Sequence, residues 1–308
     1  MAHLLLLLTK DNNCYRQLLA QQQLPGLVIA SDDPQFISKA DIWLAEPALA
    51  KPLLPLSPAL TWMQSTFAGV DLLMAPRLKQ DYLLTNVRGI FGPLMSEYLF
   101  AHLLTHIRQL PRYRTQQTAG LWQALPHASL MGKHMLILGT GSIGKHLALT
   151  ARHFGMQVTG VNRSGEQHPE FDQCYSLSDL SRVIATCDIL VSVLPSTTDT
   201  KLLLNAERLS LLKSDAIIAN LGRGDSLDET ALYQQLLTKP QQLAILDVFQ
   251  HEPLEQQHPL WRCPNAIITP HISAPSVPDQ VVAIFADNYR KFIQQQPLNH
   301  KVDFKRGY

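Results

Sequence analysis

The sequence has little charge and no excess of either sign. Lysine and arginine number 26 and aspartate and glutamate 25, which leaves a net charge of +1 over 308 residues. A protein that binds nucleic acid needs a basic excess to neutralise phosphates, so we expect no nucleic-acid partner. Hydrophobic residues make up 46 % of the chain and charged residues 17 %. This balance excludes a disordered chain and predicts a globular protein with a substantial core.

Cysteine is scarce, and no two cysteines lie close together in the sequence. There is no Cys-x-x-Cys motif, and the four cysteines are Cys14, Cys174, Cys187 and Cys263. This spacing favours neither a disulfide framework nor a thiolate zinc site. We therefore expect free thiols and a cytoplasmic protein.

Membrane segments and metal-ligand clusters are also missing. The apolar run at residues 4–8 is far too short for a signal or membrane segment, so we interpret it as a buried strand and expect no membrane association. His102 and His106 have a spacing that can bind a metal on a helix, but no third ligand accompanies them. The sequence therefore predicts no metal site.

What the sequence does contain is a regular alternation of short apolar runs and helix-like stretches. In the first third, the runs are residues 4–8, 26–30, 41–45, 60–64 and 82–86. After a helical stretch at residues 93–110, six more runs follow at residues 134–138, 157–161, 189–193, 216–220, 242–246 and 266–268. A last helix is predicted at residues 278–294. Such alternation is typical of parallel sheets built from βα units.

We therefore predict an α/β fold of two domains. A Rossmann-type doubly wound parallel sheet is inserted into a smaller, flavodoxin-like substrate domain. The substrate domain comprises residues 1–95 and 276–308, and the dinucleotide-binding domain comprises residues 96–275.

A glycine-rich loop follows the first predicted strand of the second domain. It reads Gly139-Thr140-Gly141-Ser142-Ile143-Gly144 and opens a helix. The first glycine permits a tight turn, the second lets the backbone approach a pyrophosphate, and the third allows the helix to pack closely on the strand. Because a strand precedes the loop and a helix follows it, the loop predicts dinucleotide binding rather than a plain turn.

The next strand should end in an acidic residue if the cofactor were NAD, because a carboxylate holds the ribose 2′-hydroxyl. Asn162-Arg163-Ser164 stands there instead. Without the carboxylate a 2′-phosphate is not repelled, while Arg163 and Ser164 can donate hydrogen bonds to it. We therefore predict a preference for NADPH over NADH. The alternative interpretation is that Arg163 is an ordinary solvated surface residue.

Three further segments follow predicted strands of the second domain. They are Asn220-Leu221-Gly222-Arg223-Gly224-Asp225-Ser226-Leu227-Asp228-Glu229, Leu246-Asp247-Val248-Phe249-Gln250-His251-Glu252-Pro253-Leu254 and Thr269-Pro270-His271-Ile272-Ser273-Ala274. Because parallel strands place their carboxyl ends at one edge of a sheet, we expect Arg223, Asp247, Glu252 and His271 to gather at the cofactor-binding edge.

Together these motifs resemble the D-isomer-specific 2-hydroxyacid dehydrogenase family over nearly the whole chain. Two more segments carry the resemblance: Phe67-Ala68-Gly69-Val70-Asp71 and Leu194-Pro195-Ser196-Thr197-Thr198-Asp199-Thr200. Within the family, the Phe67 loop, Asn162-Arg163-Ser164 and Ser96-Glu97-Tyr98 look most like the glyoxylate/hydroxypyruvate reductase A type.

The resemblance implies a role for each of these positions. Arg223, Glu252 and His271 correspond to the family's catalytic residues. The backbone N–H groups of Ala68, Gly69 and Val70 would bind the substrate carboxylate, although a tight turn capped by Asp71 fits the same residues. The cofactor would contact Leu194, Pro195, Thr200 and Asp247, although Asp247 also suits a helix-capping role.

The residue types suit the reduction of a 2-keto acid, which needs a hydride donor, a proton donor and a cation for the carboxylate. Arg223, between two glycines, can reach both the carboxylate and the carbonyl oxygen. His271 can donate a proton near neutral pH, and a neighbouring carboxylate, for which Glu252 is the candidate, would raise its pKa.

The resemblance thus implies NADPH-dependent reduction of glyoxylate to glycolate and of hydroxypyruvate to D-glycerate. Two alternatives stay open: a dinucleotide-sensing, corepressor-like binding protein, and a D-2-hydroxyacid dehydrogenase for a bulkier 2-keto acid. Because the family usually dimerises through the nucleotide domain, we also expect a homodimer, with the irregular stretch at residues 113–123, including Trp122, as its arm.

Overall fold

The computed structural model describes residues 2–31 and 33–307. It divides into two compact units, one formed by Met1–Ile90 with Pro275–Tyr308 and the other by Phe91–Ala274. The chain therefore crosses between the units twice. The sequence placed these boundaries after residues 95 and 275. The first boundary of the structure comes earlier because the helix α3 begins at Phe91 and packs on the helix α5 of the second unit.

The first unit contains a parallel sheet of five strands in the order β2-β1-β3-β4-β5. The strands are β1 (His3–Leu8), β2 (Leu27–Ile29), β3 (Ile42–Ala45), β4 (Trp62–Ser65) and β5 (Leu83–Thr85). All five predicted strands are present, and the order 2-1-3-4-5 is that of flavodoxin-like sheets, as predicted. The central strands β3 and β4 are buried along their whole length because both faces of the sheet are covered.

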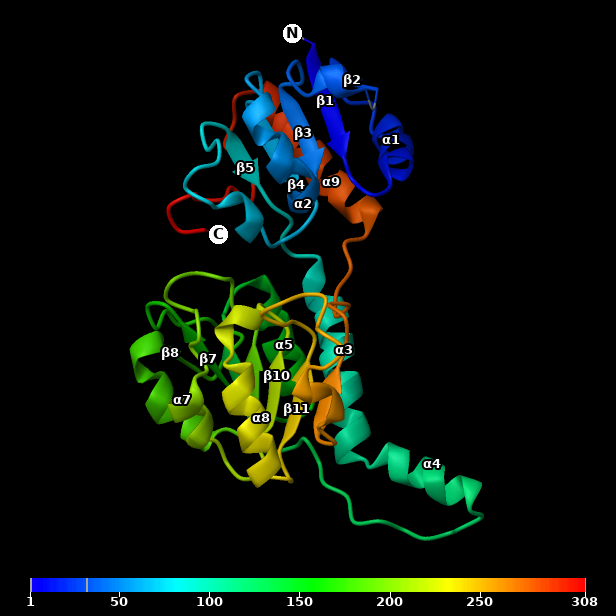
Figure 1. Cartoon of the computed structure of the whole chain (residues 1–308), viewed down its shortest axis with the longest axis vertical. Coiled ribbons are helices and arrows are strands. Elements are labelled where there is room, and N and C mark those ends of the chain that lie inside the picture. The colour runs from blue at the N-terminus through cyan, green and yellow to red at the C-terminus, as the bar shows by residue number, and fades with distance from the viewer. Residues whose placement is uncertain (1, 32, 308) are drawn as a thin grey trace. The chain divides into compact units, whose positions relative to one another are not determined.

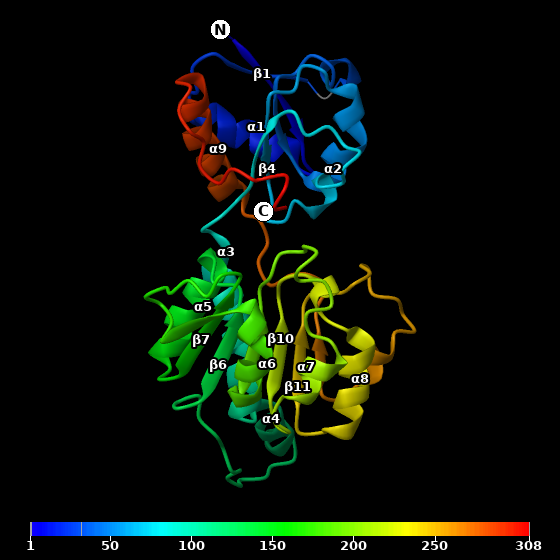
Figure 2. The ribbon, with the colours of Figure 1, turned by 90° about the vertical axis from the view of Figure 1, so that its left-hand side faces the viewer.

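The described part of this unit has three α-helices: α1 (Asn12–Gln21), α2 (Pro47–Ala50) and α9 (Pro278–Ile293). The helices α1 and α9 pack side by side on one face of the sheet, opposite α2 (Figure 2). The helix α9 returns the C-terminal part of the chain to this unit, where the ring of Phe285 stacks on Trp62 of β4 with centroids 5.1 Å apart.

The second unit contains a parallel sheet of seven strands in the order β12-β11-β10-β9-β6-β7-β8. They are β6 (His134–Leu138), β7 (Gln157–Asn162), β8 (Gln173–Ser176), β9 (Ile189–Ser192), β10 (Ile217–Asn220), β11 (Leu243–Leu246) and β12 (Ala266–Ile268). The strand order reverses between β6 and β9, which makes this a doubly wound Rossmann-type sheet with its switch point at β6.

The prediction of six strands in this unit was wrong by one. The strand β8 was missed because its sequence, Gln-Cys-Tyr-Ser, contains no apolar run. It lies at the edge of the sheet, where only Cys174 is fully buried, so one face of the strand needs no apolar residues.

Six α-helices belong to the second unit: α3 (Phe91–Ile107), α4 (Leu110–Thr118), α5 (Ser142–His153), α6 (Leu180–Val183), α7 (Ala206–Ser210) and α8 (Glu229–Thr238). The helices α3 and α5 bury apolar residues on one face of the sheet, and α6, α7 and α8 do so on the other (Figures 1 and 2). Thus each face of the sheet has its own apolar core.

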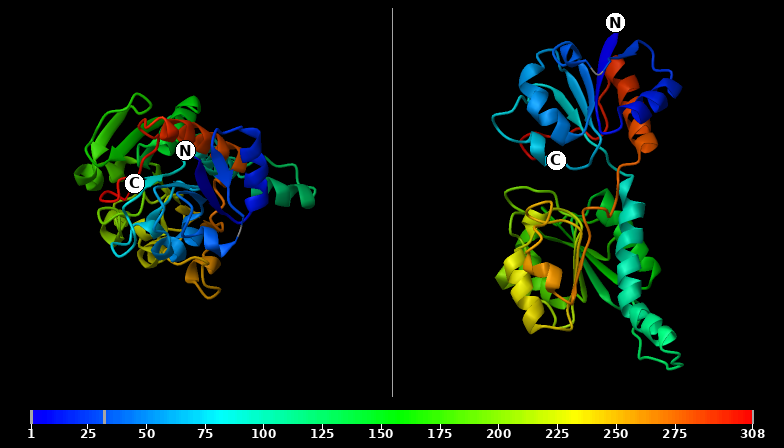
Figure 3. Two further views of the ribbon diagram at one scale, coloured as in Figure 1. Left: turned by 90° about the horizontal axis from the view of Figure 1, so that it is seen from above. Right: turned by 45° about the vertical axis from the view of Figure 1, so that its right-hand side comes forward.

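The helix predicted at residues 93–110 is interrupted. Gln109 has a φ of 53°, a left-handed conformation that ends the helical path, and α4 begins at the next residue. Part of the stretch predicted to be irregular, residues 113–118, is therefore helical. Figure 3 shows α4 continuing beyond the end of α3 before the chain turns back.

None of the helices that the structure describes is long and apolar enough to cross a membrane.

Candidate active site

The glycine-rich loop joins β6 to α5, and two of its glycines are required by close backbone contacts. Gly139 has a φ of 103°, which L side chains rarely adopt. A Cβ atom on Gly144 would lie 1.9 Å from the carbonyl oxygen of Gly139, so no side chain fits there. These contacts hold the start of α5 directly against the end of β6.

Gly141 differs from these two glycines. A Cβ atom added to it would meet nothing within 4 Å, and the residue caps α5 without any side-chain hydrogen bond. The N–H groups at the start of this 12-residue helix therefore adjoin open space. A helix N-terminus that follows a glycine turn at the switch point of a parallel sheet fits a dinucleotide pyrophosphate. Ser142 and Ile143 lie in this first turn, and Thr140 is buried beside it.

The loop after β7 is organised by Asn162. Its side-chain oxygen accepts hydrogen bonds from the backbone N–H groups of Ser164, Gly165 and Glu166, and its amide group donates to the Thr140 hydroxyl at 3.1 Å. The polar atoms of Asn162 are thus used within the protein. Arg163 and Ser164 are exposed at the outside of this turn.

The loops after β9, β10 and β11 contact one another through glycine. A Cβ atom on Gly222 would lie 2.7 Å from the backbone nitrogen of Leu194, and one on Gly224 would lie 1.9 Å from the carbonyl carbon of Phe249. The loop that begins with Leu194 and Pro195 is closed by Thr200, whose hydroxyl donates to the Pro195 carbonyl at 2.7 Å. The glycines therefore let the backbone on either side of Arg223 press against the two adjacent loops.

Glu252 and His271 form the central pair of the site. The Nδ1 atom of His271 lies 2.9 Å from Oε2 of Glu252, and Oε1 of Glu252 accepts the N–H of Phe249 at 3.0 Å. Arg223 lies at the same edge of the sheet, where its guanidinium donates to the Gly222 carbonyl. The imidazole of His271 is half exposed, at 51 % of its side-chain surface, so Nε2 remains available to a ligand.

The pair shifts the ionisation of both partners. The hydrogen bond to Glu252 raises the pKa of His271 above its usual value, against burial and the positive charge of Arg223, which lower it. Burial raises the pKa of Glu252, but the hydrogen bonds from His271 and Phe249 outweigh it, so the net pKa of Glu252 is lowered. The site thus holds a carboxylate beside a histidine that keeps its proton to higher pH than a free one.

Asp247 is fully buried just before the loop that carries Glu252, and it holds the turn that carries His271. Its carboxylate accepts the N–H of Ile272 at 2.8 Å, the N–H of Ser273 at 2.9 Å and the hydroxyl of Thr269. The N–H of His271 donates to the Asp247 carbonyl at 2.9 Å. Asp247 therefore holds a loop turn and caps none of the described helices, so the helix-capping role considered for it is not the one the structure shows.

The predicted substrate-binding turn lies in the first unit, after β4. The Asn86 side chain donates to the Ala68 carbonyl at 2.7 Å, and the Ser65 hydroxyl bonds both to the N–H and to the carbonyl of Phe67. Val70 is buried, and Ala68 and Gly69 are partly exposed. This bracing leaves the turn in a defined conformation.

Comparison with known proteins places these features in a family. A sequence model of the D-isomer specific 2-hydroxyacid dehydrogenase NAD-binding domain matches residues 100–273. The chain is 30 % identical to a glyoxylate/hydroxypyruvate reductase A from Salmonella choleraesuis over 248 residues, which cover 78 % of this chain and 80 % of that protein. The chain belongs to the D-isomer specific 2-hydroxyacid dehydrogenase family. It is accordingly an NAD(P)-dependent dehydrogenase.

Solved structures of the family agree. A D-isomer specific 2-hydroxyacid dehydrogenase family protein from Aeromonas salmonicida has a TM-score of 0.92 and 51 % identity, covering 99 % of this chain and 100 % of that one. An NADPH-dependent glyoxylate/hydroxypyruvate reductase from Sinorhizobium meliloti, solved with NADP and sulfate, has a TM-score of 0.88 and 26 % identity, with full coverage of both chains. This dehydrogenase therefore has the family's fold along its whole length.

Sequence reasoning missed two residues of the dehydrogenase site. Thr269 was quoted only as part of a motif, and Tyr98 only as part of the family resemblance. In the structure their hydroxyl groups are 2.6 Å apart, and Thr269 in turn donates to Asp247. A signal existed in the sequence, because Thr269 stands two residues before His271, but nothing indicated that Tyr98, 171 residues away, would contact it.

The two types of glycine in the loop predict opposite outcomes for the same substitution. Gly144→Ala should lower the free energy of unfolding by about 2–4 kcal/mol, because the new methyl group meets a backbone atom that cannot move aside. Gly141→Ala should leave stability nearly unchanged but weaken NADPH binding by about tenfold or more, because the methyl group enters the space for the pyrophosphate. Thermal unfolding and NADPH fluorescence titration measure the two effects. Parent-like NADPH affinity in Gly141→Ala would remove this loop as the cofactor site.

Proposed function

We propose that this dehydrogenase reduces glyoxylate to glycolate and hydroxypyruvate to D-glycerate with NADPH. The observation that carries the proposal is the hydrogen bond between His271 and Glu252, at the sheet edge where Arg223 also lies. The similarity to a glyoxylate/hydroxypyruvate reductase A and to a reductase solved with NADP supports the choice of substrates and cofactor.

Each residue has one task in this reaction. NADPH supplies the hydride that is added to the carbonyl carbon. Protonated His271 donates its Nε2 proton to the carbonyl oxygen, so that one hydride and one proton convert the ketone or aldehyde to an alcohol. Glu252 accepts the Nδ1 hydrogen bond, which orients the imidazole and favours its protonated form.

Binding of the substrate depends on positive charge and on backbone donors. Arg223 pairs with the carboxylate and polarises the carbonyl, for which its planar group of N–H donors is suited. The family resemblance implies a role in carboxylate binding for the backbone N–H groups of Ala68, Gly69 and Val70, in the turn after β4. Leu194, Pro195 and Thr200 form the loop that contacts the cofactor, and Asp247 holds the turn beside it.

Removing the acid tests the proposal. His271→Ala should lower the turnover number for glyoxylate by about 100- to 10,000-fold, the usual contribution of general acid catalysis. In the parent, the rate of reduction should fall as pH rises through the pKa of His271, because the proton to be donated is lost there, and this pKa is raised above that of a free histidine. The measurement is the loss of NADPH absorbance across a pH series.

Two controls accompany this experiment. His153→Ala removes an exposed histidine of the same unit and should leave the rate unchanged. NADPH titration should give the same affinity for His271→Ala as for the parent. A His271→Ala variant that keeps most of its turnover contradicts the assignment, and a parent that binds NADPH but reduces neither acid favours a dinucleotide sensor.

The preference for NADPH rests on the exposed Arg163 and Ser164 at the end of β7. Arg163→Ala should lower kcat/KM with NADPH by about 10- to 100-fold, because charged hydrogen bonds to the 2′-phosphate are lost, and should change kcat/KM with NADH by less than about threefold. Steady-state kinetics with both cofactors measure this difference. Arg77→Ala, which removes an exposed arginine of the first unit, serves as the control for a general change in charge. A parent that prefers NADH would contradict the preference.

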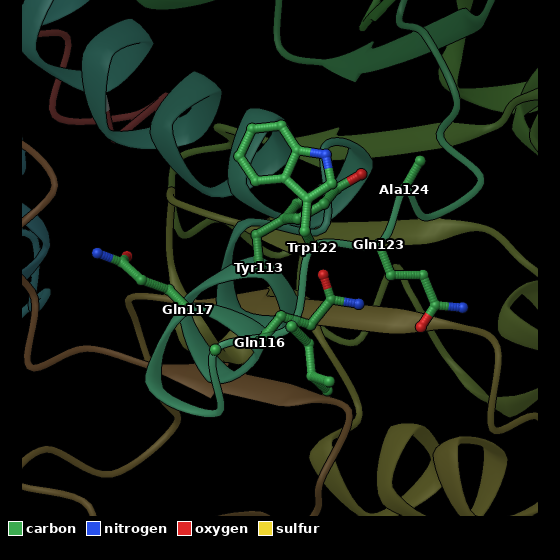
Figure 4. Close-up of a pocket in the computed structure, with 8 residues that line it drawn as sticks. Tyr113, Gln116, Gln117, Trp122, Gln123 and Ala124 are labelled. Carbon is green, nitrogen blue, oxygen red and sulfur yellow. The ribbon is translucent and has the colours of Figure 1, made fainter.

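We further propose that the dehydrogenase is a homodimer that associates through the arm formed by α4 and residues 119–124. Trp122 has 103 % of its reference surface exposed and Leu121 57 %, an unusual exposure for large apolar side chains. They line an open hollow together with Tyr113, Gln116 and Gln117 of α4 (Figure 4). A second copy of this arm would cover these side chains, as in an isologous interface.

Trp122→Glu should shift the protein from dimer toward monomer, because it places a charge in the apolar centre of the proposed interface. The molar mass in solution, measured by light scattering over a range of concentrations, shows the shift. Trp261→Glu alters another exposed tryptophan of the same unit and should leave the mass unchanged. A parent that is monomeric at every concentration would exclude the dimer.

We also expect a reducing, cytoplasmic environment, because all four cysteines are free thiols.

A further inference from the structure

A chain of hydroxyl groups connects the helix α3 to the turn that carries His271. The phenolic oxygen of Tyr98 lies 2.6 Å from Oγ1 of Thr269, and Oγ1 of Thr269 donates to Oδ1 of Asp247 at 2.5 Å. None of these contacts is needed to explain substrate or cofactor binding.

Counting protons shows which hydroxyl group donates in each of these hydrogen bonds. A threonine hydroxyl has one hydrogen, and Thr269 gives it to the carboxylate of Asp247. The oxygen of Thr269 can then only accept, so Tyr98 must be the donor in the remaining contact. Burial raises the pKa of Tyr98 to about 12, so the phenol keeps the proton that it donates.

Asp247, at the far end of this chain of hydroxyl groups, determines the conformation of His271. Asp247 accepts the N–H groups of Ile272 and Ser273, the two residues that follow His271, and its carbonyl accepts the N–H of His271 itself. His271 has a φ of 55°, a left-handed conformation that is unfavourable for a residue with a side chain. The turn is held in this conformation by the hydrogen bonds to Asp247.

We propose that Tyr98 is a positioning residue for His271, which it orients through Thr269 and Asp247. Its donated hydrogen bond strengthens the one from Thr269 to Asp247, because hydrogen bonds in a chain polarise one another. Asp247 is thereby kept in the one place from which it holds the His271 turn, and the imidazole is kept in line with Glu252. The kinetic consequence rests on the proposed function, in which His271 donates the proton, whereas the structural consequence does not.

Among the described residues, charged groups act on both ends of this chain of hydroxyl groups. Glu252, Arg223 and Asp247 act on the pKa of His271. At the other end, the negative charge of Asp247 acts on Tyr98, and the ring of His102 lies edge-on to the Tyr98 ring with centroids 4.7 Å apart. Because the hydrogen bond with Glu252 is the largest of the effects on His271, misalignment of the imidazole should lower its pKa.

The first experiment needs no enzyme activity. Tyr98→Phe removes only the hydroxyl, and the imidazole of His271 is titrated by NMR in protein labelled at histidine, with its signal identified by its absence from His271→Gln. The pKa of His271 should fall by about 0.3–0.5 units in Tyr98→Phe, as its alignment with Glu252 is loosened. Tyr233→Phe, which removes a hydroxyl that has no hydrogen bond within the described part of the chain, should leave the titration unchanged. An unchanged or raised pKa in Tyr98→Phe overturns the proposal.

The second experiment measures coupling. Tyr98→Phe should lower the turnover number about 3- to 10-fold and move the alkaline fall of the rate to lower pH, with NADPH affinity retained. In the His271→Ala background the same substitution should change the residual rate by less than about twofold, because the residue on which Tyr98 acts is gone.

Thr269→Val breaks the same chain at its centre, and the double variant with Tyr98→Phe should be no slower than Thr269→Val alone. Additive losses in both double variants overturn the proposal. If no 2-keto acid is turned over by the parent, the proposed function fails while the NMR titration still decides the role of Tyr98.

Discussion

The hydrogen bonds to the buried carboxylate of Asp247 are the constraint on which the active edge of the second unit depends. One side chain accepts two backbone N–H groups and a hydroxyl, and its own carbonyl accepts a third N–H group. A carboxylate without water is costly unless such donors surround it, so this residue and the turn around His271 require each other. This turn presents the imidazole of His271 to Glu252, and the hydrogen bond between the two side chains raises the pKa of His271.

The remaining loops are held by contacts of a different kind, in which glycine allows one backbone to touch another. Gly222 and Gly224 leave no room for a Cβ atom against the loops after β9 and β11, so Arg223 stands between two fixed points. Gly144, at the start of α5, likewise leaves no room for a Cβ atom against the carbonyl group of Gly139. Polar groups therefore fix the position of His271, and close packing fixes the position of Arg223. Both kinds of contact lie at one edge of the sheet because all seven strands run parallel.

Much of this could be predicted from the sequence because it depends on local patterns. The apolar runs identified five strands of the first unit and six of the second, and the motifs after the strands indicated that Arg223, Asp247, Glu252 and His271 would share an edge. The edge strand β8 escaped because a strand with one polar face at the rim of a sheet has no apolar run. The helix α4 escaped because none of its residues is buried, so no apolar periodicity marks it and residues 113–123 were predicted to be irregular.

Other features depend on contacts between distant segments, which composition and spacing do not record. Asn162 was predicted as a cofactor-binding residue, which stays a prediction, and the sequence did not indicate that its side chain would also be hydrogen-bonded to Thr140 and to the loop that exposes Arg163. Likewise the contact of Tyr98 with Thr269 spans 171 residues and depends on how α3 packs beside the sheet. Polar residues that stabilise a loop and those that bind a ligand have the same sequence signature, and only their hydrogen-bond partners distinguish them.

Under the proposed function, the charges at the edge would tie proton donation to the presence of substrate. Arg223 lowers the pKa of His271, in opposition to Glu252. A substrate carboxylate paired with Arg223 would neutralise the charge that has this effect, so the pKa of His271 would rise on binding. The proton would therefore be held most firmly when a carbonyl oxygen is present to receive it, and the addition of hydride to that carbonyl would create the stronger base that draws the proton away. In the proposed function, one guanidinium would thus bind the acid substrate and, once neutralised, would prepare the histidine beside it for proton donation.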